Sequence, residues 1–130
     1  NAKLILNISS KVPIWNLNSM TEFFMEIILK NKTALEKSID KTKIDRKSFI
    51  KSLNDLEFVE KAYNSGANFI LFKTNSKLSV INLADNLIQN HSIYIKDVSN
   101  KFNSKTNTYF RVAVRSPKDN NMLIKILHNV

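Results

Sequence analysis

The arginines are the residues whose type and spacing most clearly indicate a binding chemistry. The chain has 20 lysines and arginines, of which only Arg46, Arg111 and Arg115 are arginine. A planar guanidinium grips a carboxylate or phosphate through two parallel hydrogen bonds, which lysine cannot do. Two of the three fall in the alternating segment Thr108–Arg115, where an even spacing puts side chains on one face of a strand. The segment therefore predicts either an anion clamp or exposed cross-strand ion pairs.

Residue counts exclude several other chemistries. The chain has no cysteine, which excludes a disulfide framework, a zinc ribbon and a thiol nucleophile. Its single glycine, Gly66, excludes a glycine-rich phosphate loop. The only histidines, His91 and His128, are far apart in sequence, so we expect no metal site. No apolar run approaches the ~20 residues of a membrane span. We therefore expect a cytoplasmic protein without a membrane partner.

The net charge of +9 at pH 7 raises the expectation of an anionic partner. A small basic module that binds nucleic acid or an acidic protein is one candidate, and a solvated helix face is the simpler explanation. The lysines concerned lie within one predicted helix: Lys37, Lys41, Lys43, Lys47 and Lys51. Specific nucleic-acid binding is not expected, because no dense arginine cluster is present and Phe69 and Phe72 fall on opposite faces of their strand.

Hydrophobic periodicity predicts the elements that position these residues. The pattern indicates an α+β fold, a single domain over residues 1–130, with the order α-α-β-β-α-β-β-α. About four mostly antiparallel strands are expected, covered on one side by helices. The predicted strands are Glu57–Tyr63, Asn68–Lys73, Ser92–Asp97 and Thr108–Arg115, with a polar turn at Asn103–Thr106. The predicted helices begin at Ser19, run over Thr33–Leu53 and Lys77–Asn90, and begin after Ser116.

Each of the first two predicted helices has a group that requires a partner elsewhere: an apolar surface in the first helix and a charged side chain in the second. The first helix, which Ser19 and Glu22 would open as a capping box, is apolar around most of its circumference. It is either a central core helix or a helix that packs against something outside this sequence. In the second helix, Arg46 falls on the apolar stripe, so its charge must be paired or must reach solvent.

Four short motifs occur in a fixed order and together resemble a known family. They are Val12-Pro-Ile-Trp-Asn-Leu-Asn-Ser19, Ala67-Asn-Phe-Ile-Leu71, Ile95-Lys-Asp-Val-Ser99 and Tyr109-Phe-Arg-Val-Ala-Val114. Their order and spacing resemble the C-terminal small domain of class I/II, fold-type-I pyridoxal-phosphate-dependent aminotransferases. The branch is that of histidinol-phosphate aminotransferase and threonine-phosphate decarboxylase. The resemblance covers about residues 12–130 and implies a C-terminal part of a longer enzyme.

The resemblance implies roles for three residues. Arg111 would grip the substrate α-carboxylate, and Lys96 would line the same site where the family has arginine, which puts a phosphorylated substrate in doubt. Asn68 matches a family position to which no firm role is transferred, and Arg115 matches none. The residues that hold pyridoxal phosphate would lie upstream, so Lys11 is interpreted as a linker lysine and the chain alone as inactive. Implied partners are amino-acid and 2-oxo-acid substrates, an N-terminal cofactor domain and a second subunit.

Overall fold

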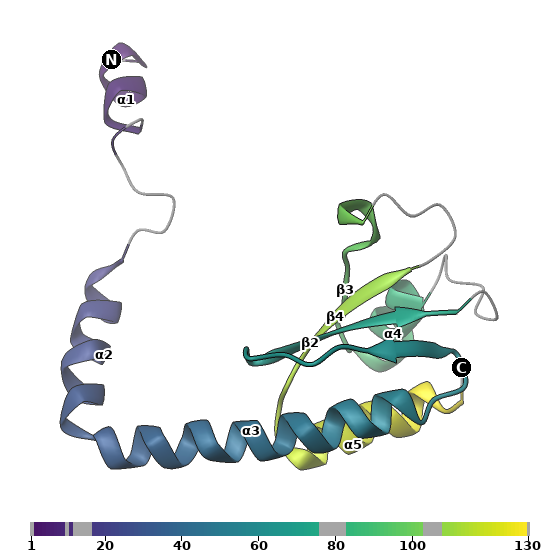
Figure 1. Ribbon diagram of the computed structural model, residues 1–130. Helices are drawn as coiled ribbons and strands as arrows, with labels where there is room; N and C mark the ends of the chain where they lie inside the picture. The colour runs from purple at the N-terminus through teal and green to yellow at the C-terminus, as the bar shows by residue number, and fades with distance from the viewer. Residues whose placement is uncertain (1, 10, 12–16, 76–82, 103–107, 130) are drawn as a thin grey trace. The chain divides into compact units, whose positions relative to one another are not determined.

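The computed structural model describes residues 2–9, 11, 17–75, 83–102 and 108–129 (Figure 1). The predicted turn at Asn103–Thr106 and the start of the predicted helix at Lys77 lie outside these residues. The chain divides into two compact units, Asn1–Lys37 and Ser38–Val130. A single domain over residues 1–130 stays a prediction.

The first unit contains helices α1 (Ala2–Ser9) and α2 (Ser19–Lys30) and the start of α3 (Lys32–Asn54). Helix α1 is not among the predicted elements. The predicted capping box is wrong, because Asn18 caps α2 and Ser19 is already helical. The Oδ1 atom of Asn18 accepts a hydrogen bond from the Thr21 backbone N–H at 2.9 Å. An asparagine amide reaches the third amide of the helix as well as a serine hydroxyl does, so the cap lies one residue earlier.

Helix α2 has no buried residue, and neither has α1. Phe23 and Phe24 of α2 are 62% and 58% exposed, and Leu29 is 77% exposed. The interpretation of α2 as a central core helix is therefore wrong for this chain. Its apolar surface is left without a partner among the described residues.

The second unit is built on a four-stranded sheet of order β1-β2-β4-β3 in which every neighbouring pair is antiparallel. Its strands are β1 (Val59–Ala62), β2 (Phe69–Thr74), β3 (Lys96–Asp97) and β4 (Tyr109–Ala113). The hairpin β1–β2 passes through Gly66, as the turn residues predict. The predicted antiparallel sheet is confirmed.

Helices pack on one face of this sheet, as predicted (Figure 1). Every second residue of β2 and β4 is buried there, and the rings of Phe72 and Phe110 lie 5.5 Å apart between centroids. The helices α3, α4 (Leu83–His91) and α5 (Pro117–Leu127) share this core. Their buried apolar residues are Phe49, Leu53, Leu83, Leu87, Leu123 and Leu127. Each buried Leu or Phe contributes about 1.5–3 kcal/mol, which makes this face the source of the fold's stability.

The strand predicted over Ser92–Asp97 is shorter in the structure, where β3 has only two residues. The cause is the end of α4. The backbone N–H of Ile93 donates to the Leu87 carbonyl at 3.0 Å, and Ser92 takes φ 55°. The helix thus ends with a residue in the left-handed conformation, which turns the chain so that Tyr94 does not pair with β4. A short helix η2 (Ser99–Lys101) follows β3.

Strand β4 also ends earlier than predicted, at Ala113 rather than Arg115. The buried side chain of Asn120, in α5, occupies both backbone groups of Arg115. Its Oδ1 accepts from the Arg115 N–H and its amide nitrogen donates to the Arg115 carbonyl, each at 3.0 Å. The side chain thus replaces a neighbouring strand at this position.

Arg46 of α3 has a partner that its sequence position did not reveal. Its Nη1 donates to the backbone carbonyl of Ala67 at 2.8 Å, just before β2. The half-buried guanidinium is therefore satisfied by a carbonyl oxygen, and it ties α3 to the β1–β2 hairpin.

Candidate functional site

The face of the sheet that no helix covers carries both basic and aromatic side chains. Strand alternation places Phe69, Leu71 and Lys73 of β2 on this open face, opposite Ala113, Arg111 and Tyr109 of β4 respectively. Residues on this face are exposed or half-buried, whereas their neighbours in sequence are buried. The side chains of the open face therefore lie outside the buried core of the second unit.

Arg111 lies in the middle of the open face and is exposed. Its guanidinium carbon lies over the ring of Phe69, 4.7 Å from the centroid. None of the ion pairs among the described residues includes Arg111. Its N–H donors are consequently available to an anion outside the chain.

Lys96 of β3 is directly opposite Arg111 in the register, so the two side chains are on the same face. Lys96 is exposed, and in the described ranges it too has no carboxylate partner. Two like charges at directly opposed positions destabilise a sheet unless an anion lies between them. The structure thus brings together two of the three residues that the sequence singled out.

Asn68, the third of these residues, is not joined to the pair. It precedes β2, its side chain is exposed, and its backbone carbonyl accepts from the Val114 N–H at 2.8 Å. Nothing in the described residues links its side chain to Arg111. A binding role for Asn68 stays a prediction.

An aromatic pair borders the basic residues and was missed in the sequence. The ring of Phe102 stacks on that of Tyr109, with centroids 4.1 Å apart and an interplanar angle of 19°. Tyr109 belongs to β4 and Phe102 follows η2. Period-2 alternation does place Tyr109 on the open face, but no local pattern indicates that a residue beyond η2 returns to cover it.

Lys73 is a cation on the open face that does have an acidic partner. Its Nζ donates to Oε1 of Glu60 at 2.6 Å, and this hydrogen bond raises the pKa of Lys73 above its usual value. The Glu60 carboxylate neutralises Lys73 locally. Among the described ion pairs, Arg111 and Lys96 have no such acidic neighbour, so both add positive potential to the open face.

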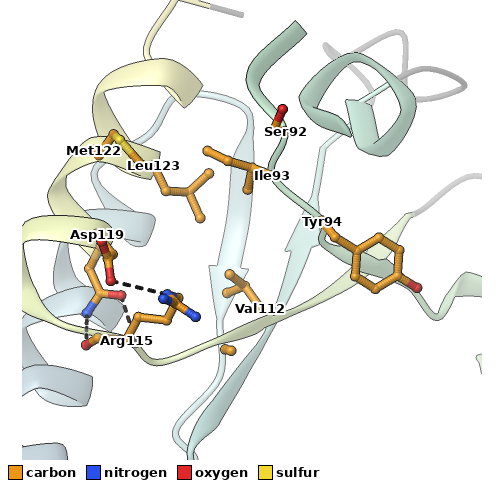
Figure 2. Close-up of a pocket in the computed structure, with 10 residues that line it drawn as sticks. Ser92, Ile93, Tyr94, Val112, Arg115, Asp119, Met122 and Leu123 are labelled. Carbon is orange, nitrogen blue, oxygen red and sulfur yellow. Dashed lines mark hydrogen bonds and ion pairs between the residues drawn. The ribbon is translucent and has the colours of Figure 1, made fainter. Parts of the chain in front are cut away.

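Arg115, the second arginine of the segment, has internal partners (Figure 2). Its Nε donates to Oδ2 of Asp119 at 3.2 Å, four residues later. A hydrogen bond from Ser116, followed by that from Arg115, lowers the pKa of the Asp119 carboxyl below its usual value. Arg115 therefore stabilises the junction between β4 and α5.

A pocket of about 460 Å³ lies beside this junction, where the chain after α4 diverges from β4. Figure 2 shows Ile93 and Leu123 facing one another across it, with Arg115 and Asp119 at its border. Its lining includes the mostly apolar residues Tyr94, Val112, Ala113 and Met122. The pocket is a consequence of the short β3, and it does not include Arg111 or Lys96.

The described residues do not fit pyridoxal phosphate. The cofactor needs a sheltered lysine for imine formation and a set of donors for its phosphate. Lys11, which follows α1, is exposed, and Gly66 lies in the β1–β2 hairpin. Over the described ranges, no group of three or more His, Cys, Asp or Glu residues could hold a metal ion, and no helix is long and apolar enough to cross a membrane.

Comparisons with known proteins find relatives over almost all of this chain, although no family model matches it. The adenosylcobalamin biosynthesis bifunctional protein CobDQ of Leptospira interrogans is 31% identical over 124 residues, which are 95% of this chain and 14% of that protein. The histidinol-phosphate aminotransferase structure from Clostridium acetobutylicum superposes with a TM-score of 0.75 at 27% identity, over 99% of this chain and 38% of that one.

The L-threonine-O-3-phosphate decarboxylase structure from Porphyromonas gingivalis superposes with a TM-score of 0.68 at 26% identity, over 87% of this chain and 34% of that one. The chain thus spans well under half the length of the relatives it matches. In sequence, the histidinol-phosphate aminotransferase of Flavobacterium psychrophilum is 29% identical over 126 residues, which are 95% of this chain and 34% of that protein. Along nearly its whole length, this chain therefore matches one part of the enzymes of the pyridoxal-phosphate-dependent aminotransferase family.

Proposed function

We propose that this chain is the C-terminal small domain of a pyridoxal-phosphate-dependent enzyme and that Arg111 binds the α-carboxylate of its amino-acid and 2-oxo-acid substrates. The observation that supports this role is the arrangement on the open face. An exposed guanidinium without an acidic partner stands directly opposite a second unpaired cation, Lys96. A bound carboxylate would satisfy both charges, and the basic-module alternative accounts for neither the register nor the relatives.

In this proposal each residue has a separate task. The planar guanidinium of Arg111 donates two parallel hydrogen bonds to the two carboxylate oxygens, which fixes the plane of the carboxylate. Lys96 contributes a second positive charge as a point donor, without fixing an orientation. The two together position the substrate α-carbon relative to the cofactor domain.

The cofactor itself would be held by an N-terminal domain outside this chain. When bound there, pyridoxal phosphate supplies the electron sink that weakens bonds at the α-carbon. The exposed apolar residues of α2 support such a domain, because Phe23, Phe24 and Leu29 find no core within the described residues. We expect the α2 amides to exchange hydrogen more slowly in the complete enzyme than in the 130-residue chain, as seen by mass spectrometry. Equal exchange would contradict this docking.

The carboxylate role is tested by the kinetics of two matched variants of the complete enzyme. Arg111→Lys keeps the charge but loses the fork, and it should cost about 2–4 kcal/mol of transition-state stabilisation, roughly 30- to 900-fold in kcat/KM. Arg115→Lys makes the same chemical change four residues away and should alter kcat/KM only slightly. Equal small effects would remove Arg111 from the site, and a larger effect of Arg115→Lys would assign the role to Arg115.

A labelling experiment tests the location of the cofactor site. The 130-residue chain is mixed with pyridoxal phosphate and reduced with borohydride, which traps any imine. We expect no single lysine to be labelled stoichiometrically, because Lys11 is exposed to solvent and a reactive lysine needs a sheltered environment. Selective labelling of Lys11 would contradict the placement of the cofactor lysine upstream.

A further inference from the structure

Phe69 is an aromatic residue that the core does not use. It begins β2 on the open face and is 37% exposed, whereas the next residue, Ile70, is fully buried. Its ring makes one described interaction with a charged group, the contact at 4.7 Å with the guanidinium of Arg111. Phe69 is not part of the buried core cluster, and its ring faces the guanidinium of Arg111 instead.

The register explains how the two side chains meet. Phe69 is directly opposite Ala113, and Arg111 is directly opposite Leu71, so Phe69 and Arg111 are diagonal neighbours on adjacent strands. Diagonal side chains are within reach of one another when they are long or aromatic. The small Ala113 leaves the space beside Phe69 open to the guanidinium.

A cation over the face of a ring is attracted by the ring's negative face, and this attraction uses none of its N–H donors. The five donors of Arg111 therefore remain available at the edge of the guanidinium for a carboxylate. On the opposite side, the charge of Lys96 disfavours a position of Arg111 nearer to β3. Ring attraction and charge repulsion thus act in the same direction.

We propose that Phe69 is a positioning residue that holds the Arg111 guanidinium ready to bind a carboxylate. This inference rests on the proposed role of Arg111 as the carboxylate clamp. Without the ring, the arginine side chain would have to be ordered by the ligand itself, and the entropy of this ordering would reduce affinity. Loss of a cation–π contact at an exposed site should weaken carboxylate binding about two- to fivefold.

The test uses nuclear magnetic resonance on the 130-residue chain with succinate as the carboxylate probe. The chain has three arginines and hence three Nε–H signals, which single variants assign. The Arg111 signal reports the ring-current shift of Phe69 and, during titration, succinate binding. The Arg46 signal serves as a control, because Arg46 bonds to Ala67 two residues before Phe69 and reports whether the start of β2 has moved.

Three variants separate the possible causes. Phe69→Leu removes the ring and should abolish the ring-current shift and weaken succinate binding two- to fivefold, with the Arg46 signal unchanged. Phe69→Tyr keeps a ring and should preserve both properties. Phe102→Leu removes another exposed ring, one that stacks on Tyr109 and not on Arg111, and should leave the Arg111 signal and its titration unchanged.

The outcomes distinguish this inference from the proposed function. If Arg111→Ala abolishes the titration and Phe69→Leu binds succinate as well as the unsubstituted chain, Phe69 is not a positioning residue and the carboxylate role stands. If succinate does not move the Arg111 signal of the unsubstituted chain, or if Arg111→Ala binds equally well, both ideas are wrong. An equal loss in Phe102→Leu would also overturn the role of Phe69.

Discussion

The middle of β4 and the junction that follows this strand contain the same residue type, yet the surroundings of the two arginines differ in kind. At Arg111 the neighbours are an aromatic ring and a second cation, and the described ion pairs leave both charges without an acid. At Arg115 an aspartate pairs with the side chain and a buried asparagine pairs with the backbone. The first arrangement is incomplete without an anion, whereas the second is complete within the chain. Neighbouring groups, rather than residue type, separate a binding residue from a structural one.

The largest expected effect on stability tests whether the hydrogen bonds around Arg115 are satisfied within the chain. Asn120→Ala removes the partner of both Arg115 backbone groups and leaves them without hydrogen bonds beside the core, which should lower the free energy of unfolding by about 1–3 kcal/mol. Urea denaturation of the chain measures this. The matched control is Asn121→Ala, since Asn121 is the exposed neighbour in the same helix and its loss should have little effect.

A smaller effect concerns the point where the chain leaves α4 beside the Arg115 pocket. Ser92 has φ 55°, a conformation that costs a residue with a side chain more than it costs glycine. Ser92→Gly should therefore raise the free energy of unfolding by about 0.5–1 kcal/mol. Ser92→Ala keeps the unfavourable conformation and should give no gain. Loss of stability in Ser92→Gly would show that the serine side chain itself matters there.

A reversal of charge beside Arg111 should stabilise the chain, whereas the loss of Asn120 beside Arg115 should destabilise it. Lys96→Glu replaces a like-charged cross-strand pair by an opposite one and should stabilise the chain by about 0.2–1 kcal/mol in low salt. The same variant should bind succinate more weakly, because the new carboxylate occupies Arg111. Lys101→Glu, in η2 outside the sheet, changes the net charge equally and is the control. A Lys96→Glu chain that is less stable would contradict the repulsion between Lys96 and Arg111.

The smallest expected effect is a dependence of the free energy of unfolding on pH, which arises at Asp119, the partner of Arg115. The pKa of Asp119 is lower in the folded chain than its usual value, because the carboxylate accepts hydrogen bonds from Ser116 and Arg115. The resulting stabilisation is present above the unfolded pKa and is lost as the pH falls through the folded pKa. Asp119→Asn should therefore flatten the stability profile below about pH 4. An unchanged profile would mean that these hydrogen bonds do not form in solution.

The sequence was sufficient for the parts of the fold that depend on local patterns. Alternation in Thr108–Arg115 predicted the buried and open faces of β4. The start of α5 after Ser116 was also predicted correctly, and Ser116 caps this helix by accepting from the Asp119 N–H at 3.2 Å. The lengths of β3 and β4 were not predictable in this way. They depend on the left-handed residue Ser92 and on Asn120, whose side chain acts from another element.

The candidate site was predictable only in part, for the same reason. A residue's face follows from its own strand, so Arg111 could be placed on the open face of the sheet. The registers that bring Lys96 opposite Arg111 and Phe69 diagonal to it involve residues 15 and 42 positions away, and no local pattern encodes them. The capping box at Ser19 was wrong because Asn18 and Ser19 are both good caps, and only the backbone distinguishes them.

The most direct test of the difference between the two arginines is a crystal structure of the complete enzyme with a 2-oxo-acid substrate analogue bound. We predict that both carboxylate oxygens accept hydrogen bonds from the Arg111 guanidinium, with the ring of Phe69 still behind it. We also predict that Lys96 lies within ion-pair distance of the ligand and that Arg115 stays paired with Asp119. A carboxylate bound to Arg115, or an Arg111 paired with an acidic side chain of the protein while the ligand is held elsewhere, would contradict the account.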